Sequence, residues 1–142
     1  MRAKVFLFAV VIMVSSLALP AQAQQPKKAP RIGWMEFSGS RGPSFEAFLE
    51  GLRERGYMQG QNINIEYRSG EGREDRLAEV AAELVSLKVN ALVADTNAAT
   101  VAAQKATTRI PIVFIYGDPV GDGLISSLAR PGGNLTGLIF LF

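Results

Sequence analysis

From Arg31 onward, hydrophobic and polar residues follow two alternating periods. Short apolar runs, typical of buried strands, predict strands at residues 32–37, 91–94, 110–116 and 135–142, and alternating apolar and polar residues predict a half-exposed strand at 63–67. Between them, apolar residues recur at the i, i+3, i+4, i+7 spacing of one helix face. This spacing and the small-residue stretch after residue 96 predict helices at 45–55, 77–87 and 97–107, with a short fourth helix around 124–129. Gly56 is expected to end the first helix and Asp75 to cap the second.

The order of these elements indicates the fold class. Strands that alternate with helices through short connections are parallel and are joined by right-handed crossovers. We therefore predict an α/β fold with an open parallel sheet of about five strands and helices on both faces. The run Ala91–Ala94 is too short and too apolar for an edge strand, and Trp34 and Met35 are expected in the core.

The first 30 residues are expected to lie outside this fold. Residues 1–23 have the positive start, apolar middle and small-residue end of a signal peptide. The apolar run Val5–Leu19 is short for a bilayer span, which needs about 20 residues. We expect cleavage near Gln24, a polar leader at 24–30 and a periplasmic location. No cysteine follows the apolar run, so lipid attachment is not expected.

Composition removes several classes of function. The chain contains no cysteine and no histidine, which excludes disulfides, thiol nucleophiles, Ser-His-Asp triads and imidazole or thiolate metal sites. The precursor has a formal net charge of +2, and loss of Arg2 and Lys4 with the signal peptide makes the mature chain formally neutral. We therefore expect no nucleic-acid partner.

Candidate binding residues follow the predicted strands. In an open parallel sheet, ligands bind outside the carboxyl ends of the strands, where helix N-termini face the crevice. Three loops there supply candidate ligand-binding residues: Ser38, Gly39, Ser40, Thr96, Asn97, Ala98 and Asp118. Hydroxyls, amides and glycine suit neutral hydrogen bonding or an anion held by backbone N–H groups. The same residue types also serve as helix caps and turn formers, and the two uses are compatible.

An enzyme is the alternative at this edge, because Asp95 and Asp118 both end strands as an acid/base pair would. No lysine or histidine stands at a neighbouring strand end to assist them. Asp118 is followed by Pro119, a common turn-starting pair, and Asp95 is placed to cap the next helix. The chain also lacks the glycine spacing of a dinucleotide or P-loop site. We therefore expect no catalysis and no cofactor.

Several motifs resemble one family. They occur in order and at the expected intervals: GLRERGY, GQN, IPIV, DPVG and ARPGGNLTG. Over residues 31–138 the chain is similar to ABC transporter substrate-binding proteins of the type I periplasmic-binding fold, in the group whose relatives take up tryptophan and tyrosine. One departure is the DTNAAT stretch at Asp95, where relatives more often carry a glycine-rich turn.

The resemblance implies a function and a domain organisation. Family members have two lobes around a ligand cleft that closes by hinge motion, and they deliver their solute to an ABC permease. Residues 31–142 correspond to the N-terminal lobe, and the apolar end IFLF stands where relatives cross into the second lobe. We expect a truncated receptor for a small amino-acid-like or carboxylate solute, weakened or inactive without its second lobe. By resemblance, Ser38–Ser40 and Thr96–Ala98 would line the cleft, and Asp118 would meet a ligand amine.

Two other interpretations stay open. A self-contained flavodoxin-like α/β domain or small enzyme would form its site within one lobe, although the apolar ending argues against it. The ligand domain of a sugar-sensing regulator shares the fold, but the signal peptide and the missing DNA-binding segment argue against that class.

Overall fold

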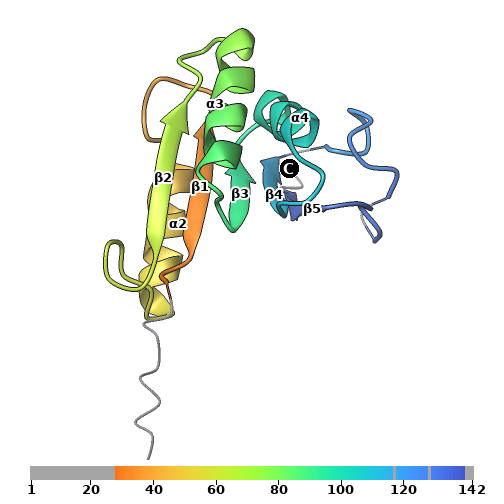
Figure 1. Ribbon diagram of the computed structural model, residues 1–142. Coiled ribbons are helices and arrows are strands. Elements are labelled where there is room, and N and C mark those ends of the chain that lie inside the picture. The colour runs from red at the N-terminus through yellow and green to blue at the C-terminus, as the bar shows by residue number, and fades with distance from the viewer. Residues whose placement is uncertain (1–27, 117, 128, 140–142) are drawn as a thin grey trace, which may run out of the picture.

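The computed structural model describes residues 28–116, 118–127 and 129–139 (Figure 1). The predicted signal peptide at 1–23, most of the leader, and the end of the last predicted strand at 140–142 lie outside the described residues. Within the described ranges, no helix has the length and apolar character needed to cross a bilayer.

Five strands and three helices follow one another along the described chain. Their bounds are β1 Arg31–Glu36, α2 Pro43–Glu54, β2 Asn64–Ser69, α3 Glu74–Ser86, β3 Ala91–Ala94, α4 Asn97–Ala106, β4 Ile112–Tyr116 and β5 Leu135–Ile139. Each lies within a predicted element or overlaps most of it. The apolar runs and the helical spacing therefore identified all eight elements.

The short helix predicted around 124–129 is wrong. The described residues between β4 and β5 form turns and bends. The backbone N–H of Asp122 bonds the carbonyl of Asp118, and that of Leu124 bonds the carbonyl of Pro119. Gly123 then has a φ of +72°, a left-handed conformation that stops these turns from continuing as a helix.

The sheet is fully parallel with the strand order β2-β1-β3-β4-β5 (Figure 1). This confirms the α/β prediction and places Ala91–Ala94 inside the sheet, between β1 and β4. Because the chain leaves β1 toward one edge and returns toward the other, right-handed crossovers put α2 on one face and α3 and α4 on the opposite face. The two apolar clusters described next follow that division.

Trp34 and Met35 are both fully buried, as predicted, but they belong to different sides of the sheet. Met35 packs in the larger cluster under α3 and α4 with Leu77, Leu84 and Leu92. Trp34 packs in the smaller cluster under α2, in edge-to-face contact with Phe45 at 5.0 Å between ring centroids. Successive residues of a strand point to opposite faces, so adjacent positions of β1 anchor both layers.

Helix α2 covers only part of its face of the sheet. A groove of about 430 Å³ runs beside it over the inner strands. Its lining includes Phe48, Val93, Val113, Ile115 and Leu138, of which Leu138 is 64% exposed. The sequence pattern did not show this opening, because Phe48 lies on the apolar face of a predicted helix and the other residues belong to apolar runs typical of full burial.

Of the two helix termini predicted from the sequence, one is confirmed and the other is wrong. Gly56, with a φ of +81°, follows α2, and the N–H groups of Gly56 and Tyr57 bond the carbonyls of Arg53 and Leu52. This Schellman arrangement confirms the predicted end of the helix. The predicted Asp75 cap is wrong, because Arg73 is the N-cap and makes no side-chain cap bond. Asp75 lies in the first turn, paired with the Arg73 guanidinium.

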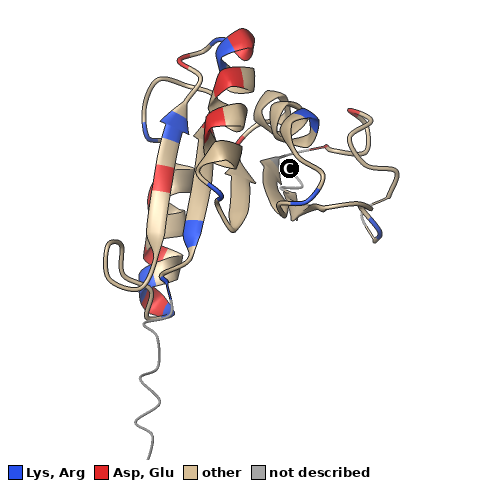
Figure 2. Cartoon of the chain, viewed as in Figure 1, with Lys and Arg blue, Asp and Glu red and all other residues tan. Residues whose placement is uncertain are grey.

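Charged side chains are unevenly distributed over the described part of the chain (Figure 2). Acidic and basic residues alternate on α2, β2 and α3, where Arg68 bonds Glu83 at 2.7 Å and approaches Glu66 at 3.5 Å. The inner strands β3 and β4 carry none. This interspersion differs from the single-sign face that a nucleic-acid interface presents.

Candidate functional site

The carboxyl ends of β1 and β3 lie side by side, which brings two of the three predicted loops together. Met35 pairs with Ala94 in the parallel ladder, so the residues that follow each strand are neighbours. The N–H of Asp95 donates to the Met35 carbonyl at 3.2 Å. The N–H of Phe37 donates to Asp95 Oδ1 at 3.0 Å. The loop after β1 is therefore joined directly to the turn that begins α4.

Ser38, Gly39 and Ser40 form the exposed part of the first loop. The Ser38 hydroxyl is within hydrogen-bond distance of Glu36 Oε1 and of the Ser40 carbonyl, both at 3.0 Å. The Ser69 hydroxyl donates to the Ser38 carbonyl, which ties the loop to the end of β2. A side chain at Gly39 would meet open space within 4 Å. The loop is held at its base and open at its tip.

Thr96, Asn97 and Ala98 form the start of α4, as predicted. Thr96 is the N-cap, and its hydroxyl accepts the N–H of Ala99 at 3.2 Å. Asn97 donates through Nδ2 to Asp122 Oδ2 at 2.9 Å. Its Oδ1 atom is buried and has no hydrogen-bond partner among the described residues. The Ala98 side chain packs against the core, so this residue can offer a ligand only its backbone.

Asp118 follows β4 and is exposed, as a ligand-binding carboxylate would be. Its Oδ1 accepts the N–H of Gly121 at 2.8 Å, which confirms that Asp118 and Pro119 start a turn. Among the described residues, no hydrogen bond joins Asp118 to the other two loops. The residue of its loop that reaches α4 is Asp122. The structure thus joins two predicted loops directly and the third through a residue that the sequence did not single out.

A buried carboxylate at this edge was missed in the sequence. Glu36 ends β1 and is only 6% exposed. Trp34 Nε1 donates to its Oε2 at 3.2 Å, and the Ser38 hydroxyl donates to its Oε1. The Asp95 carboxyl lies beside it, because β1 and β3 are paired up to Met35 and Ala94. The available signal was a single charge inside the apolar run IGWMEF, where a carboxylate needs several partners to be buried.

The environment of Asp95 raises its pKa to about 8. Burial is the largest cause, followed by the hydrogen bond with Glu36 and the negative charge of Glu36. The Phe37 N–H and the Thr96 hydroxyl oppose this shift, because both donate to the charged form. Burial and the neighbouring Glu36 therefore favour the protonated form of Asp95.

Aromatic side chains flank the carboxyl pair on the α2 side. Tyr67 lies 5.0 Å from Phe45 between ring centroids, and the Arg41 guanidinium lies 5.1 Å from the Tyr67 centroid. The Tyr67 hydroxyl is buried and has no hydrogen-bond partner among the described residues. Burial, Glu36 and Asp95 raise the Tyr67 pKa, while Arg41 lowers it. Arg41 is the cation nearest this aromatic group and is itself exposed.

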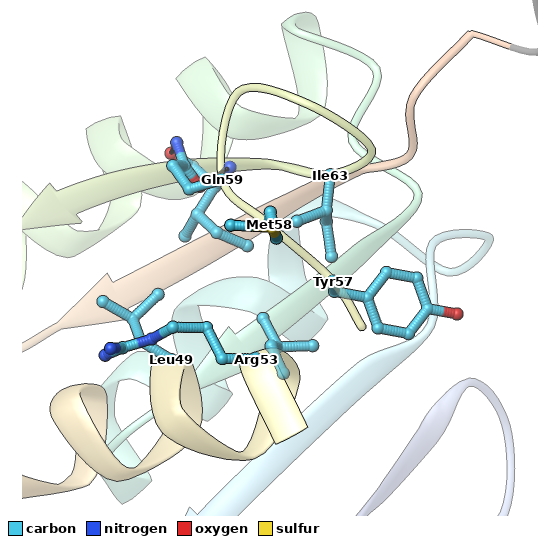
Figure 3. A pocket seen from close by; sticks show the side chains of 8 residues that line it. Leu49, Arg53, Tyr57, Met58, Gln59 and Ile63 are labelled. Atoms are coloured by element: carbon cyan, nitrogen blue, oxygen red, sulfur yellow. Dashed lines mark hydrogen bonds between the residues drawn. The ribbon is translucent and has the colours of Figure 1, made fainter. Parts of the chain in front are cut away.

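A separate cavity of about 330 Å³ lies at the opposite edge, beside the amino end of β2 (Figure 3). Leu49 and Arg53 of α2 line it together with Tyr57, Met58 and Gln59 of the following loop. We place the candidate site at the carboxyl edge instead, because the helix N-termini and the joined polar loops lie there. Among the described residues, no group of three acidic side chains could hold a metal ion.

Comparison with known proteins identifies the family. Residues 39–139 match the model of the ABC transporter substrate binding protein family. A tyrosine-binding protein from Clostridioides difficile strain R20291 is 34% identical over 93 residues, which cover 65% of this chain and 27% of that protein. This chain therefore spans well under half the length of that relative.

Solved structures agree with this assignment. A ligand-free, open substrate-binding protein with adhesive properties from Clostridium difficile superposes with a TM-score of 0.72 at 27% identity, over 80% of this chain and 40% of that one. An ABC domain in complex with L-Trp from Streptococcus pneumonia superposes with a TM-score of 0.69 at 28% identity, over 78% of this chain and 38% of that one. A conserved domain protein from Vibrio cholerae superposes with a TM-score of 0.73 at 31% identity, over 80% of this chain and 40% of that one. The resemblance seen in the sequence is confirmed: this chain belongs to the ABC transporter substrate-binding protein family.

Proposed function

We propose that this chain forms one lobe of the solute-binding component of an ABC uptake transporter and binds a small amino-acid-like or carboxylate solute at the carboxyl edge of its sheet. The observation that carries the proposal is the 3.0 Å hydrogen bond from Phe37 to Asp95, which joins the loop after β1 to the start of α4. The relatives support the solute class, because one is a tyrosine-binding protein and another was solved with L-Trp.

Each predicted residue has a role in this proposal. Ser38, Gly39 and Ser40 form one exposed wall. Backbone N–H groups at the first turn of α4 favour a carboxylate, because a helix N-terminus carries a partial positive charge. The buried, unpartnered Oδ1 of Asn97 can accept a hydrogen bond from a solute. Asp118 offers an exposed negative charge to a solute ammonium group.

The family membership extends the proposal to location and partner. Residues 1–23 would direct export to the periplasm, and the folded receptor would deliver its solute to a permease in the inner membrane. The protein would have no catalytic activity of its own, as in a family of substrate-binding proteins.

The share of the solved relatives that this chain covers gives an expected affinity. The chain spans 40% of two of the solved relatives, which suggests that it supplies about half of a two-lobed site. A micromolar site is worth about 8 kcal/mol, so half of these contacts give about 4 kcal/mol, which corresponds to a millimolar dissociation constant. The weak binding expected of this chain is therefore a quantitative prediction.

The proposal is tested by thermal unfolding of the mature chain with L-tryptophan, L-tyrosine or glucose. At ten times a millimolar Kd, a ligand adds about 1.4 kcal/mol to the free energy of unfolding. We expect L-tryptophan to raise Tm, glucose to have no effect, and Asn97→Ala to reduce the L-tryptophan shift. Gln59→Ala, at the opposite edge, serves as the matched control and keeps the full shift. An unchanged Tm with both amino acids, or loss of the shift in Gln59→Ala alone, overturns the proposal.

A further inference from the structure

The Glu36–Asp95 pair connects the two loops of the proposed solute site from below. Glu36 ends β1 and reaches Ser38 through its Oε1. Asp95 follows β3 and accepts the Phe37 N–H at 3.0 Å. The two residues directly follow the paired positions Met35 and Ala94 of adjacent strands, which brings the two carboxyl groups side by side. The loop after β1 is therefore held twice, through Ser38 by Glu36 and through Phe37 by Asp95.

The surroundings of the Glu36–Asp95 pair make a second negative charge there unfavourable. Glu36 is only 6% exposed, and its carboxyl group already receives donors from Trp34 and Ser38. The titratable and charged groups that face the pair from neighbouring elements are Tyr67 of β2 and Arg41 ahead of α2. Arg41 is exposed and stacks on Tyr67 and Phe45. A second negative charge on the pair would therefore lack a buried cation to balance it.

We propose that Glu36 and Asp95 are positioning residues for the solute site, which share one proton and thereby hold the loop after β1 against the start of α4. When the proton leaves to solvent, two carboxylates face each other in a desolvated position and repel. The loops then separate, and groups arranged for one solute lose their relative geometry. The effect on solute binding rests on the proposed function, whereas the shared proton does not.

Trp34 provides a direct reporter of the pair. It is the single tryptophan of the chain, and its indole N–H donates to Glu36. We expect its fluorescence, excited selectively, to change with pH with a midpoint near 8. Asp95→Asn keeps the acceptor for the Phe37 N–H and donates permanently to Glu36, so the transition should vanish. Glu36→Gln should move it to lower pH, because the negative charge beside Asp95 is lost and the amide donates to the Asp95 carboxylate.

Two control variants make this measurement specific. Asp118→Asn removes a carboxylate at the same edge without touching the pair, and should retain the transition. Tyr67→Phe should retain it as well, because the raised pKa of Tyr67 places its own deprotonation at higher pH. Circular dichroism verifies that each variant is folded. A wild-type titration without a transition between about pH 6 and pH 9, or an equal transition in Asp95→Asn, overturns the shared proton.

A second measurement tests the positioning role. L-Tryptophan affinity is measured by NMR titration at about pH 6.5 and about pH 9. We expect wild-type affinity to fall about fivefold or more, within the usual range of coupling between two binding events. Asp95→Asn should keep the higher affinity at both values, and Asp95→Ala should show the lower affinity at both. Equal pH dependence in wild type and Asp95→Asn overturns the positioning role. If L-tryptophan does not bind at all, the proposed function is contradicted. The fluorescence titration then still tests whether the two carboxyl groups share a proton.

Discussion

Asp95 accepts the backbone N–H of Phe37 at 3.0 Å, although the two residues are 58 positions apart in the chain. The contact exists because β1 and β3 are adjacent in the sheet while β2 lies at the edge. It converts two separate loops into one polar surface at the carboxyl edge. We make four predictions, two for residues at this edge and two for packing elsewhere in the sheet.

The first prediction concerns pH and stability. The folded-state pKa of Asp95 is about 8, above the value near 4 of an unfolded chain, so the folded state holds a proton that the unfolded state has released. This contribution is fully present below about pH 4 and is lost as the pH rises toward 8. Urea unfolding should show wild-type stability falling over that range, by no more than about 1.4 kcal/mol per pH unit. Partial exposure of Asp95 makes the total loss of stability smaller. Asp95→Asn should remove it, and an identical slope in both proteins would exclude Asp95 as its source.

The second prediction concerns the N-cap of α4. Thr96 is the one N-cap among the described helices whose side chain bonds the helix backbone. Thr96→Ala should lower the free energy of unfolding by about 1 kcal/mol. Ser40→Ala, an exposed loop position, is the matched control and should change stability by less than about 0.5 kcal/mol. Chemical denaturation of the three proteins makes the comparison, and equal stabilities would contradict the cap.

The third prediction concerns close approach of β4 and β5. A Cβ atom at Gly137 would lie 2.2 Å from the Phe114 carbonyl oxygen, which is backbone and cannot turn away. Gly137→Ala should therefore destabilise the chain by about 1–3 kcal/mol, the usual cost of overpacking. At Gly39 the same substitution meets open space, so Gly39→Ala should be tolerated. Thermal unfolding compares the pair, and a Gly137→Ala protein as stable as Gly39→Ala would contradict the geometry.

The fourth prediction concerns the groove beside α2. Leu138 is 64% exposed and forms part of its apolar lining. Leu138→Ser should reduce the fluorescence of a bound apolar dye such as ANS, with a stability change within about 0.5 kcal/mol because the side chain is largely exposed. Val120→Ser replaces another exposed apolar residue outside the groove lining and should leave dye binding unchanged. Equal dye binding by wild type and Leu138→Ser would show that the dye sits elsewhere.

The local sequence pattern was sufficient for the elements and insufficient for the site. Ala91–Ala94 is a continuous apolar run and proved to be an inner strand, and Gly56 ended its helix as glycine usually does. The segment around Leu124 has apolar residues at helical spacing, but Gly123 and the hydrogen bonds to Asp118 and Pro119 impose turns.

The Glu36–Asp95 pair shows more clearly what a local sequence pattern cannot predict. Glu36 and Asp95 meet only because of the strand order, and a local pattern carries no information on which strands are neighbours. Thr96 and Asn97 could be placed at a helix start from their residue types. Which groups Thr96 and Asn97 face at the carboxyl edge of the sheet depends on the strand order.

The central claim, that a small amino-acid-like solute binds between the loop after β1 and the start of α4, is tested most directly by a ¹⁵N NMR titration of the mature chain with L-tryptophan. The account predicts saturable shifts of the backbone amides of Ser38, Gly39, Asn97 and Ala98, with a millimolar Kd. Shifts confined to Met58 and Gln59 at the opposite edge, or none at ligand concentrations of tens of millimolar, would contradict it.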